Sequence, residues 1–270
     1  MQILLSVQPE RTIKSQVCRI LFGRSNLVQC PYCTRTGCIR RDEKFQCRRC
    51  GRAWSLTSLT WLKGMKLNWQ QLWGLVWCFI NKIPIDQTQK LLSLSKPTVY
   101  LWYAKFRIHL PAQDDVRLET IVQVDEAYFG SRKNGVALLA AKQKHTSRVA
   151  CRVLPHNNVN KQDMVPFIRQ HIIPASHVCT DGAGIYRGMG KQWPVTHQYD
   201  IHKKGQFEHT SEIEGFFGSL RTFIRRMYHY VTIQKLPEVI QEYQCRLMLP
   251  EIFTSPFTFL QNTLPHVSFA

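Results

Sequence analysis

The sequence predicts an α/β fold, a sheet with helices packed on its faces, preceded by a small metal-binding ribbon and a helical region. Three observations predict it. Two Cys-x2-Cys pairs lie near the start, a Trp- and Leu-rich stretch of helical periodicity follows, and strand-like apolar runs then alternate with helix-like ones. With 270 residues, 44% of them apolar, the chain has enough apolar side chains for packed cores and is not disordered.

The charge of the chain points to its partner. Lys and Arg number 36 against 18 Asp and Glu, a formal net charge of +18. Cations in such excess repel one another unless a polyanion is bound, which favours nucleic acid. An anionic membrane surface is the competing interpretation, but no apolar run approaches the roughly 18 residues of a membrane span. The short apolar start lacks the charged leader of a secretory signal, so we expect an intracellular protein without a membrane partner.

Two cysteine pairs predict a structural zinc site in residues 1–60. The ligands would be Cys30 and Cys33 from one turn and Cys47 and Cys50 from another, because a tetrahedral zinc ion takes four thiolates. Four unrelated thiols are the alternative. Basic residues surround these turns, and we expect them to contact DNA phosphates, although a merely solvated basic surface is the other interpretation. These residues are Arg40, Arg41, Arg48 and Arg49.

Residues 61–115 are predicted to be helical. Helices are expected over 69–80 and 85–92, with a third beginning at Lys96 after the N-cap Ser95 and with Pro97 in its first turn. This order resembles a helix-turn-helix, whose last helix enters the major groove; a plain helical linker is the alternative. The expected DNA contacts on the third helix are Lys96, Thr98, Tyr100 and Lys105.

The third region predicts a sheet that gathers carboxylates. Strands are expected over 120–125, 136–141, 148–154, 177–181 and 195–201, and helices over 159–172, capped by Asn160, and 211–228. Asp125 and Asp181 would end two of these strands, and Glu214 lies near the start of the last helix. Three converging carboxylates need cations, and Mg²⁺ prefers oxygen ligands. The pattern therefore fits two-metal phosphodiester chemistry.

Helix 211–228 carries two distinct faces. Its core stripe is expected to be Ile213, Phe216, Phe217, Leu220, Phe223, Ile224 and Met227. A second stripe places Arg221 nearly two turns from Glu214, with Gly218 between them leaving room for a DNA backbone. Arg225, as a DNA contact, and Tyr228 complete that stripe. An ordinary solvated helix face is the alternative.

Neighbouring acids are expected to lie outside this site. Glu126 should point to the opposite face of its strand from Asp125. Glu208 precedes the last helix, and Glu212 lies 200° around it from Glu214, so we expect both to matter little for metal binding.

Four sequence blocks carry a family resemblance. VDEAYFG (124–130), TDGAGIY (180–186), HTSEIEGFFGSLR (209–221) and RMYHYV (226–231) resemble the signature blocks of bacterial insertion-sequence DDE transposases with an N-terminal zinc ribbon, related to the eukaryotic Merlin transposons. The resemblance spans roughly residues 25–235. Ser131, Ser211, Phe217 and Arg221 depart from the commoner Gly, Asn, Trp and Lys.

The resemblance implies an RNase H-like mixed-sheet catalytic core. It also implies an acidic triad of Asp125, Asp181 and Glu214 with Arg221 beside it, and Mg²⁺- or Mn²⁺-dependent cleavage and strand transfer. The resulting prediction is a DNA transposase that acts on double-stranded terminal inverted repeats and target DNA as a homo-oligomer. It would be cytoplasmic and nucleoid-associated in a bacterium, or nuclear for a eukaryotic element. A non-catalytic DNA-binding relative and a hydrolytic nuclease without strand transfer remain the alternatives.

The predicted organisation has four parts. Residues 1–60 form the zinc ribbon region, 61–115 the helical DNA-binding region, 118–235 the catalytic core and 236–270 a C-terminal helix and tail.

Overall fold

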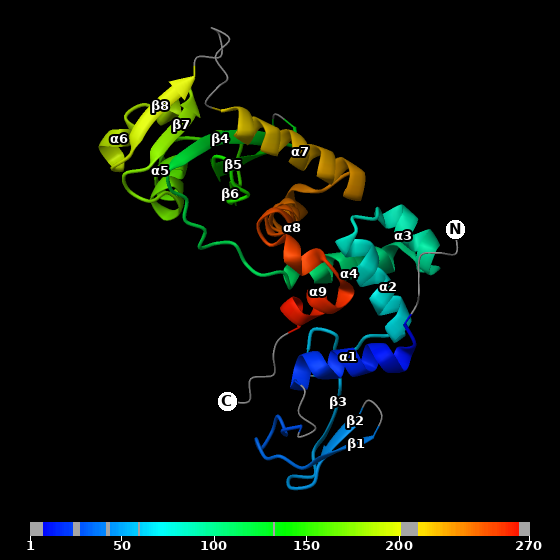
Figure 1. Cartoon of the computed structure of the whole chain (residues 1–270). Coiled ribbons are helices and arrows are strands. Elements are labelled where there is room, and N and C mark those ends of the chain that lie inside the picture. Colours follow the sequence, from blue (N-terminus) through cyan, green and yellow to red (C-terminus); the bar gives the residue numbers. More distant parts are fainter. Residues whose placement is uncertain are drawn as a thin grey trace. The chain divides into compact units, whose positions relative to one another are not determined.

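The computed structural model describes residues 8–23, 28–41, 44–58, 60–131, 133–200 and 210–264. Two compact units make up the chain (Figure 1). One comprises Met1–His109 with Glu251–Ala270, and the other Leu110–Pro250. Packing thus divides the chain at 110 and 250, whereas the sequence analysis places boundaries near 60, 117 and 235.

The first unit begins with a helix and a ribbon. Strands β1 (Cys38–Arg41), β2 (Lys44–Cys47) and β3 (Ala53–Ser55) form an antiparallel sheet in that order. Phe45 of β2 stacks on Trp54 of β3 with ring centres 5.6 Å apart and contacts Phe22 at 5.2 Å. Phe22 belongs to α1 (Glu10–Phe22), which the sequence analysis misses although its buried residues recur at helical spacing.

The remainder of the first unit is helical. It contains α2 (Trp69–Ile80), α3 (Ile85–Leu92), α4 (Lys96–Ile108) and α9 (Pro256–Thr263). The three predicted helices are confirmed, and Ser95 caps α4 by accepting a 3.3 Å hydrogen bond from the Thr98 N–H. Helix α2 is buried on nearly all sides. Phe79 shows why: it packs on Phe106 of α4 at 5.3 Å and on Phe259 of α9 at 5.6 Å.

A five-stranded mixed sheet organises the second unit. Its strands are β4 (Ile121–Phe129), β5 (Val136–Gln143), β6 (Val149–Val153), β7 (His177–Asp181) and β8 (Thr196–Asp200). Their order is β6-β5-β4-β7-β8. Strands β4, β5 and β6 pair antiparallel, whereas β4, β7 and β8 pair parallel. The predicted α/β class with a mixed sheet is confirmed.

One strand differs from its prediction in a way that concerns the site. We expect a strand ending at Asp125, but β4 continues to Phe129 because residues Glu126 to Phe129 pair with Leu139 to Val136 of β5. Asp125 is therefore in the middle of β4 and not at its end. Asp181 does end β7, as predicted.

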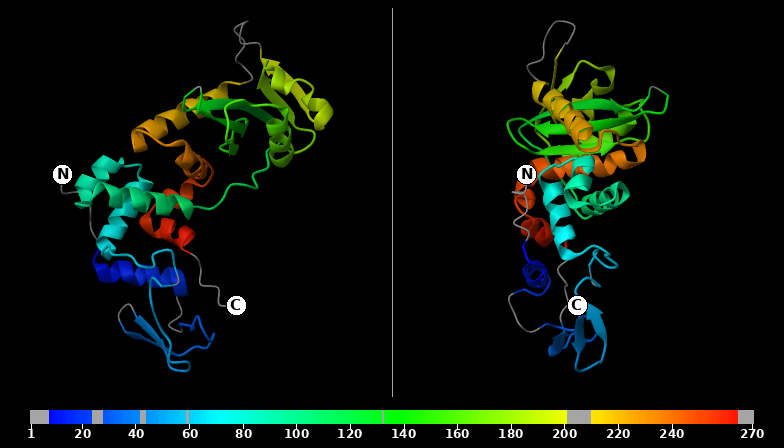
Figure 2. Two further views of the ribbon diagram at one scale, coloured as in Figure 1. Left: turned by 180° about the vertical axis from the view of Figure 1, so that it is seen from behind. Right: turned by 90° about the vertical axis from the view of Figure 1, so that its right-hand side faces the viewer.

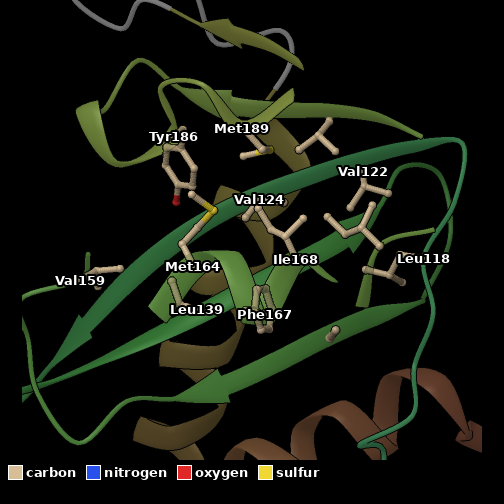
Figure 3. Close-up of a cluster of buried hydrophobic side chains, with 14 of the residues drawn as sticks. Leu118, Val122, Val124, Leu139, Val159, Met164, Phe167, Ile168, Tyr186 and Met189 are labelled. Carbon is tan, nitrogen blue, oxygen red and sulfur yellow. The ribbon is translucent and has the colours of Figure 1, made fainter. Parts of the chain in front are cut away.

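Helices cover both faces of this sheet. On one face, α5 (Lys161–His171), capped by Asn160, packs with the short elements η1 (Gly184–Tyr186) and α6 (Met189–Gln192) over a core that includes Val122, Val124 and Phe167 (Figure 3). On the other, α7 (Ser211–Tyr228) lies along the sheet in both views of Figure 2 and packs with α8 (Leu236–Met248).

Two further short turns, η3 (Ile233–Lys235) and η4 (Pro250–Phe253), flank α8. Instead of one C-terminal helix, residues 236–264 thus hold two, of which α8 packs in the second unit and α9 in the first. Within the described ranges, none of the helices combines the length and hydropathy of a membrane span.

Candidate active site and metal centre

The four predicted zinc ligands come together in the ribbon. The Cys30 and Cys50 sulfurs lie 3.6 Å apart, as do those of Cys33 and Cys47, and all four lie within 4.8 Å of one another. Zn–S bonds of about 2.3 Å in a tetrahedron require sulfur spacings of about 3.8 Å, so this arrangement fits a zinc ion.

Backbone N–H groups donate to two of these sulfurs. The amide of Tyr32 donates to Cys30 Sγ at 3.4 Å, and that of Arg49 to Cys47 Sγ at 3.3 Å. The backbone N–H groups of Cys50 and Arg49 lower the pKa of Cys47 to about 6. The pKa of Cys33 is instead raised to about 12, because a lowering backbone hydrogen bond from Arg35 is outweighed by burial and by hydrogen bonds with the other cysteine sulfurs. Cys38, which lies between the pairs, is outside the cluster, and burial raises the pKa of its thiol to about 11. The thiolate is the form that binds metal.

The basic residues of the ribbon lie at its surface. Arg40, Arg48 and Arg49 are exposed, and the guanidinium of Arg40 lies 6.0 Å from the Phe45 ring centre. The side chain of Arg41 is outside the described part of the structure. Their contact with DNA remains a prediction.

The predicted reader residues of α4 are partly engaged within the protein. Lys96 forms a 2.7 Å ion pair with Asp86, and the Thr98 hydroxyl shares a 2.7 Å hydrogen bond with Ser95. Lys105, half-buried, lies 4.9 Å from the Trp102 ring centre, whereas Tyr100 is exposed. Lys96 and Tyr100 are the two exposed members of the set, and its DNA role remains a prediction.

Sheet register brings the two aspartates together. In the parallel pair β4 and β7, Val122 lies opposite Val178 and Gln123 opposite Cys179. The pairing ends there, and the same register continued by two residues along each strand brings Asp125 level with Asp181. Side chains at one level of adjacent parallel strands point to the same face. That face is the one covered by α7, because Ala127, two residues beyond Asp125, packs against Ile213 and Phe216.

The charge of Glu214 acts on the same site. The pKa of Asp125 is raised to about 7, mainly by burial and with smaller contributions from the charges of Glu126, Asp181 and Glu214, against a lowering backbone hydrogen bond at Glu126. Among the described residues, only the four cysteines have all their ligand atoms within 4.8 Å, so the carboxylates form a wider, open set. Such a set suits Mg²⁺, which keeps several waters and binds through few carboxylates.

Glu126 has partners of its own. The Tyr186 hydroxyl, at the edge of the core cluster drawn in Figure 3, donates to Glu126 Oε2, and the Tyr128 hydroxyl donates to Oε1 at 3.4 Å. Burial raises the pKa of Glu126. Because Tyr186 packs on the α5 side of the sheet, Glu126 turns away from α7, as the strand alternation predicts.

The first turn of α7 is fastened to the sheet by residues that the sequence analysis missed. The buried Gln123 side chain, from the strand that carries Asp125, accepts a 2.8 Å hydrogen bond from the Ile213 N–H. At the N-cap, the Thr210 hydroxyl donates to the buried Asp200 carboxylate of β8 at 3.3 Å. A polar residue inside the apolar run of β4 was the one local signal for Gln123.

Glu212 makes the third contact that holds the first turn of α7 on the sheet. Its carboxylate accepts from Lys142 Nζ of β5 at 2.8 Å and from the His145 N–H at 3.1 Å. These donors lower the pKa of Glu212 against the opposing effect of burial. Three strands thus hold the turn that presents Glu214, whose own side chain is exposed. Glu208 lies outside the described residues.

Beyond that turn, the predicted faces of α7 hold with one exception. The core stripe is buried except for Ile224, which is half-buried, and Gly218, Arg221 and Arg225 are exposed. A methyl group added at Gly218 would meet nothing within 4 Å, and the Arg221 guanidinium lies 5.8 Å from the Phe129 ring centre. Tyr228 was expected on the exposed stripe but is buried, because its hydroxyl donates to the buried Glu242 of α8.

Comparison with known proteins places this unit. Residues 117–247 match the ISXO2-like transposase domain, and no curated protein matches the chain. The simian T-cell lymphotropic virus intasome is similar at 10% identity over 64% of this chain and 67% of that one, with a TM-score of 0.37. The HTLV-2 integrase catalytic core in complex with magnesium aligns at 11% identity over 54% and 96%, with a TM-score of 0.35. The BIV integrase core aligns at 11% over 47% and 82%, with a TM-score of 0.33.

The matched range runs from just before β4 to α8 and contains all three carboxylates. Residues 117–247, a little under half of the chain, therefore match the ISXO2-like transposase domain, in agreement with the family that the four sequence blocks resemble.

Proposed function

We propose that this protein is a DNA transposase. In this proposal it cleaves DNA at the ends of its element and joins the freed 3′-hydroxyl to target DNA. The observation that carries the proposal is the level pair Asp125 and Asp181, facing a helix whose first turn, with Glu214, is fastened to three strands of the sheet. A fixed geometry of oxygen ligands is what phosphodiester chemistry requires of its protein.

The carboxylates suit Mg²⁺ or Mn²⁺. Their own repulsion, with burial, holds the pKa of Asp125 near 7, and a bound cation relieves that repulsion. The residues that would hold the ion are Asp125, Asp181 and Glu214. When bound, two such ions activate an attacking oxygen and stabilise a leaving one.

The rest of α7 contacts the DNA strand. Arg221 and Arg225 offer exposed guanidinium groups to phosphates, and Gly218 keeps the helix surface low between them and Glu214. Arg221, held over the Phe129 ring, positions the strand at the carboxylates.

The first unit serves DNA recognition. Cys30, Cys33, Cys47 and Cys50 bind one structural zinc ion, and Arg40, Arg41, Arg48 and Arg49 contact phosphates beside it. Lys96, Thr98, Tyr100 and Lys105 form the contact surface of α4. The partners are double-stranded terminal inverted repeats and target DNA, bound by a homo-oligomer in the cytoplasm at the nucleoid of a bacterium, or in the nucleus.

The test is a plasmid assay. The plasmid carries the DNA segments that flank this gene, and it is incubated with the full-length protein and Mg²⁺. A transposase yields both ends cleaved and 3′ ends joined to new sites, and Asp181→Asn loses both products while still binding DNA. Cleavage without joined ends would identify a hydrolytic nuclease. Binding without any metal-dependent cleavage would identify a non-catalytic DNA-binding protein.

A further inference from the structure

We propose that a pocket at the C-terminal end of α7 binds a DNA base displaced from the duplex. The pocket has a volume of ≈ 420 Å³, within the range of ligand sites. We call it the Tyr230 pocket. Its walls come from the end of β4, the end of α7 and the segment that follows, and the residues used below are Phe129, Ser131, Asn134, Ile224, His229 and Tyr230.

The backbone is shaped to form this pocket. After α7, His229 adopts a left-handed φ of 57°, which turns the chain back toward β4. After β4, Gly130 has a φ of 89°, and a Cβ atom there would lie 3.2 Å from Ile233 Cδ1 in the pocket wall. Both are conformations that disfavour ordinary side chains: glycine adopts one without strain at Gly130, whereas His229 is a strained position, and both residues line the same pocket.

The chemistry of the lining matches a nucleobase. Phe129 and Ile224 supply apolar surface, whereas Ser131, Asn134 and His229 supply hydrogen-bonding groups. Tyr230 is 77% exposed, more than the other large hydrophobic residues of the described chain. A base has two apolar faces and a polar edge, and exposed aromatic rings bind such faces by stacking. A base inside a duplex has both faces covered, so the occupant must be unpaired.

Positive charge near the pocket favours a nucleotide over an uncharged apolar ligand. The guanidinium of Arg221 lies 5.8 Å from the ring centre of Phe129, itself part of the wall. Arg225 and Arg226, one turn further along α7, are exposed. Exposed guanidinium groups beside the pocket favour an occupant that carries negative charge, such as a nucleotide, over an uncharged apolar ligand.

The position of the pocket relates it to the carboxylates. Phe129 follows Asp125 by four residues of β4, about 13 Å at 3.3 Å per residue. Arg221 follows Glu214 by seven residues of α7, about 10 Å at 1.5 Å per residue. A duplex strand rises about 3.4 Å per nucleotide, so the captured base lies about three or four nucleotides from the cleaved bond. This last inference rests on the proposed function; base binding itself does not.

Photo-crosslinking tests the pocket. The full-length, zinc-loaded protein is irradiated without Mg²⁺ on short duplexes that contain one 5-iododeoxyuridine, either unpaired as a bulge or paired with adenine. We expect the bulged base to crosslink to Tyr230 at least about fivefold more efficiently than the paired one, since stacking of a base is worth at least that factor. Mass spectrometry of the crosslinked peptide identifies the residue.

Three variants sharpen the result. Tyr230→Ala should lose the crosslink and the preference for the bulge, whereas Tyr230→Phe, which keeps the ring, should retain the preference. Tyr199→Ala, which removes another exposed tyrosine of the same unit, should behave as wild type. Thermal melting shows that each variant is folded.

Equal crosslinking of bulged and paired bases, or an unchanged crosslink in Tyr230→Ala, would overturn the proposal. So would a change of oligomeric state in Tyr230→Ala by light scattering, which would assign the pocket to a second copy. Asp125→Asn should crosslink as wild type. Because this readout needs no cleavage, failure of the transposase proposal and failure of the pocket give different results.

Discussion

The two proposed metal-ligand sets of this protein are built in opposite ways. The four cysteines lie between residues 30 and 50, on two turns of one ribbon, and their sulfurs all lie within 4.8 Å. The three carboxylates lie between residues 125 and 214, on two strands and a helix, and form a wider set. The first is a closed shell that leaves no position for a substrate, and the second is open, the usual distinction between structural and catalytic sites.

Electrostatics act on both sets. In the ribbon, backbone N–H groups lower the pKa of Cys47 to about 6. The pKa of Cys33 is instead raised to about 12, because a lowering backbone hydrogen bond from Arg35 is outweighed by burial and by hydrogen bonds with the other cysteine sulfurs. In the core, burial and neighbouring carboxylates raise the pKa of Asp125 to about 7. Each set therefore holds a ligand whose charged form a bound cation would favour. Because the cysteines lie within one small ribbon and the carboxylates form an open set, fold stability should depend on the first set and activity on the second.

The largest effect is expected from the closed set. Cys47→Ser should unfold the ribbon and release zinc, because structural zinc binding contributes about 10–16 kcal/mol to small zinc domains. Metal analysis should find about one zinc per wild-type chain and none in the variant, and limited proteolysis should cut the ribbon while sparing residues 110–250. A folded, purified wild-type protein without zinc would contradict the assignment.

Substitutions in the carboxylate set should reduce activity without unfolding the protein. Asp125→Asn and Asp181→Asn keep the shape of the side chain but remove the charge, so cleavage should fall by about three orders of magnitude or more, about 4 kcal/mol in activation free energy. DNA binding, measured by fluorescence anisotropy, should survive. Wild-type cleavage in either variant would mean that these carboxylates are structural.

Substitutions of Glu214 and Glu212 distinguish a metal ligand from a residue that positions the helix carrying it. Glu214→Gln should abolish cleavage. Glu212→Gln should lower the cleavage rate by about tenfold to a hundredfold, because the charged hydrogen bond to Lys142 that helps to hold the helix is worth about 1.5–3 kcal/mol. The position of Glu212 around the helix predicts a small effect there, and its contacts revise that prediction.

Lys142→Met is the matched variant for Glu212→Gln, because it removes the other partner of the same ion pair. The two variants should show similar losses of cleavage and similar weakening of the apparent Mg²⁺ affinity, with unchanged DNA affinity. If Glu212→Gln were inactive while Glu214→Gln cleaved DNA, the third ligand would be misassigned.

The charge of Asp125 should also affect the free energy of unfolding. Its ordinary pKa of 3.8 rises to about 7 in the folded chain, so between these values the folded state binds more protons than the unfolded state. The free energy of unfolding therefore falls as pH rises through that window. Melting without Mg²⁺ should show Asp125→Asn to be a few degrees more stable than wild type at pH 8 and similar at pH 4. Mg²⁺ should raise only the wild-type melting temperature.

The smallest effect concerns phosphate contacts beside each set. Arg48→Ala in the ribbon and Arg225→Ala on α7 should each lower the slope of log affinity against log salt by about 0.9, one phosphate contact. Only Arg225→Ala should also slow cleavage. An unchanged slope in both variants, measured by titration at several salt concentrations, would exclude both contacts.

Local patterns in the sequence determined much of this protein. The helices Trp69–Ile80 and Ser211–Tyr228, the caps Ser95 and Asn160, and the cysteine spacing follow from periodicity, capping chemistry and ligand geometry. Each depends on residues within a few turns of one another, which is why the chain alone predicts them. The end of β7 at Asp181 belongs to this group.

Tertiary structure decided the rest. Pairing with β5 carries β4 past Asp125 to Phe129, and packing of α8 buries Tyr228 on a face that periodicity leaves exposed. The fastening of α7 by Gln123, Lys142 and Asp200 joins residues up to 90 positions apart. Such contacts depend on which strands become neighbours, and side-chain periodicity along one segment carries no information about its partners.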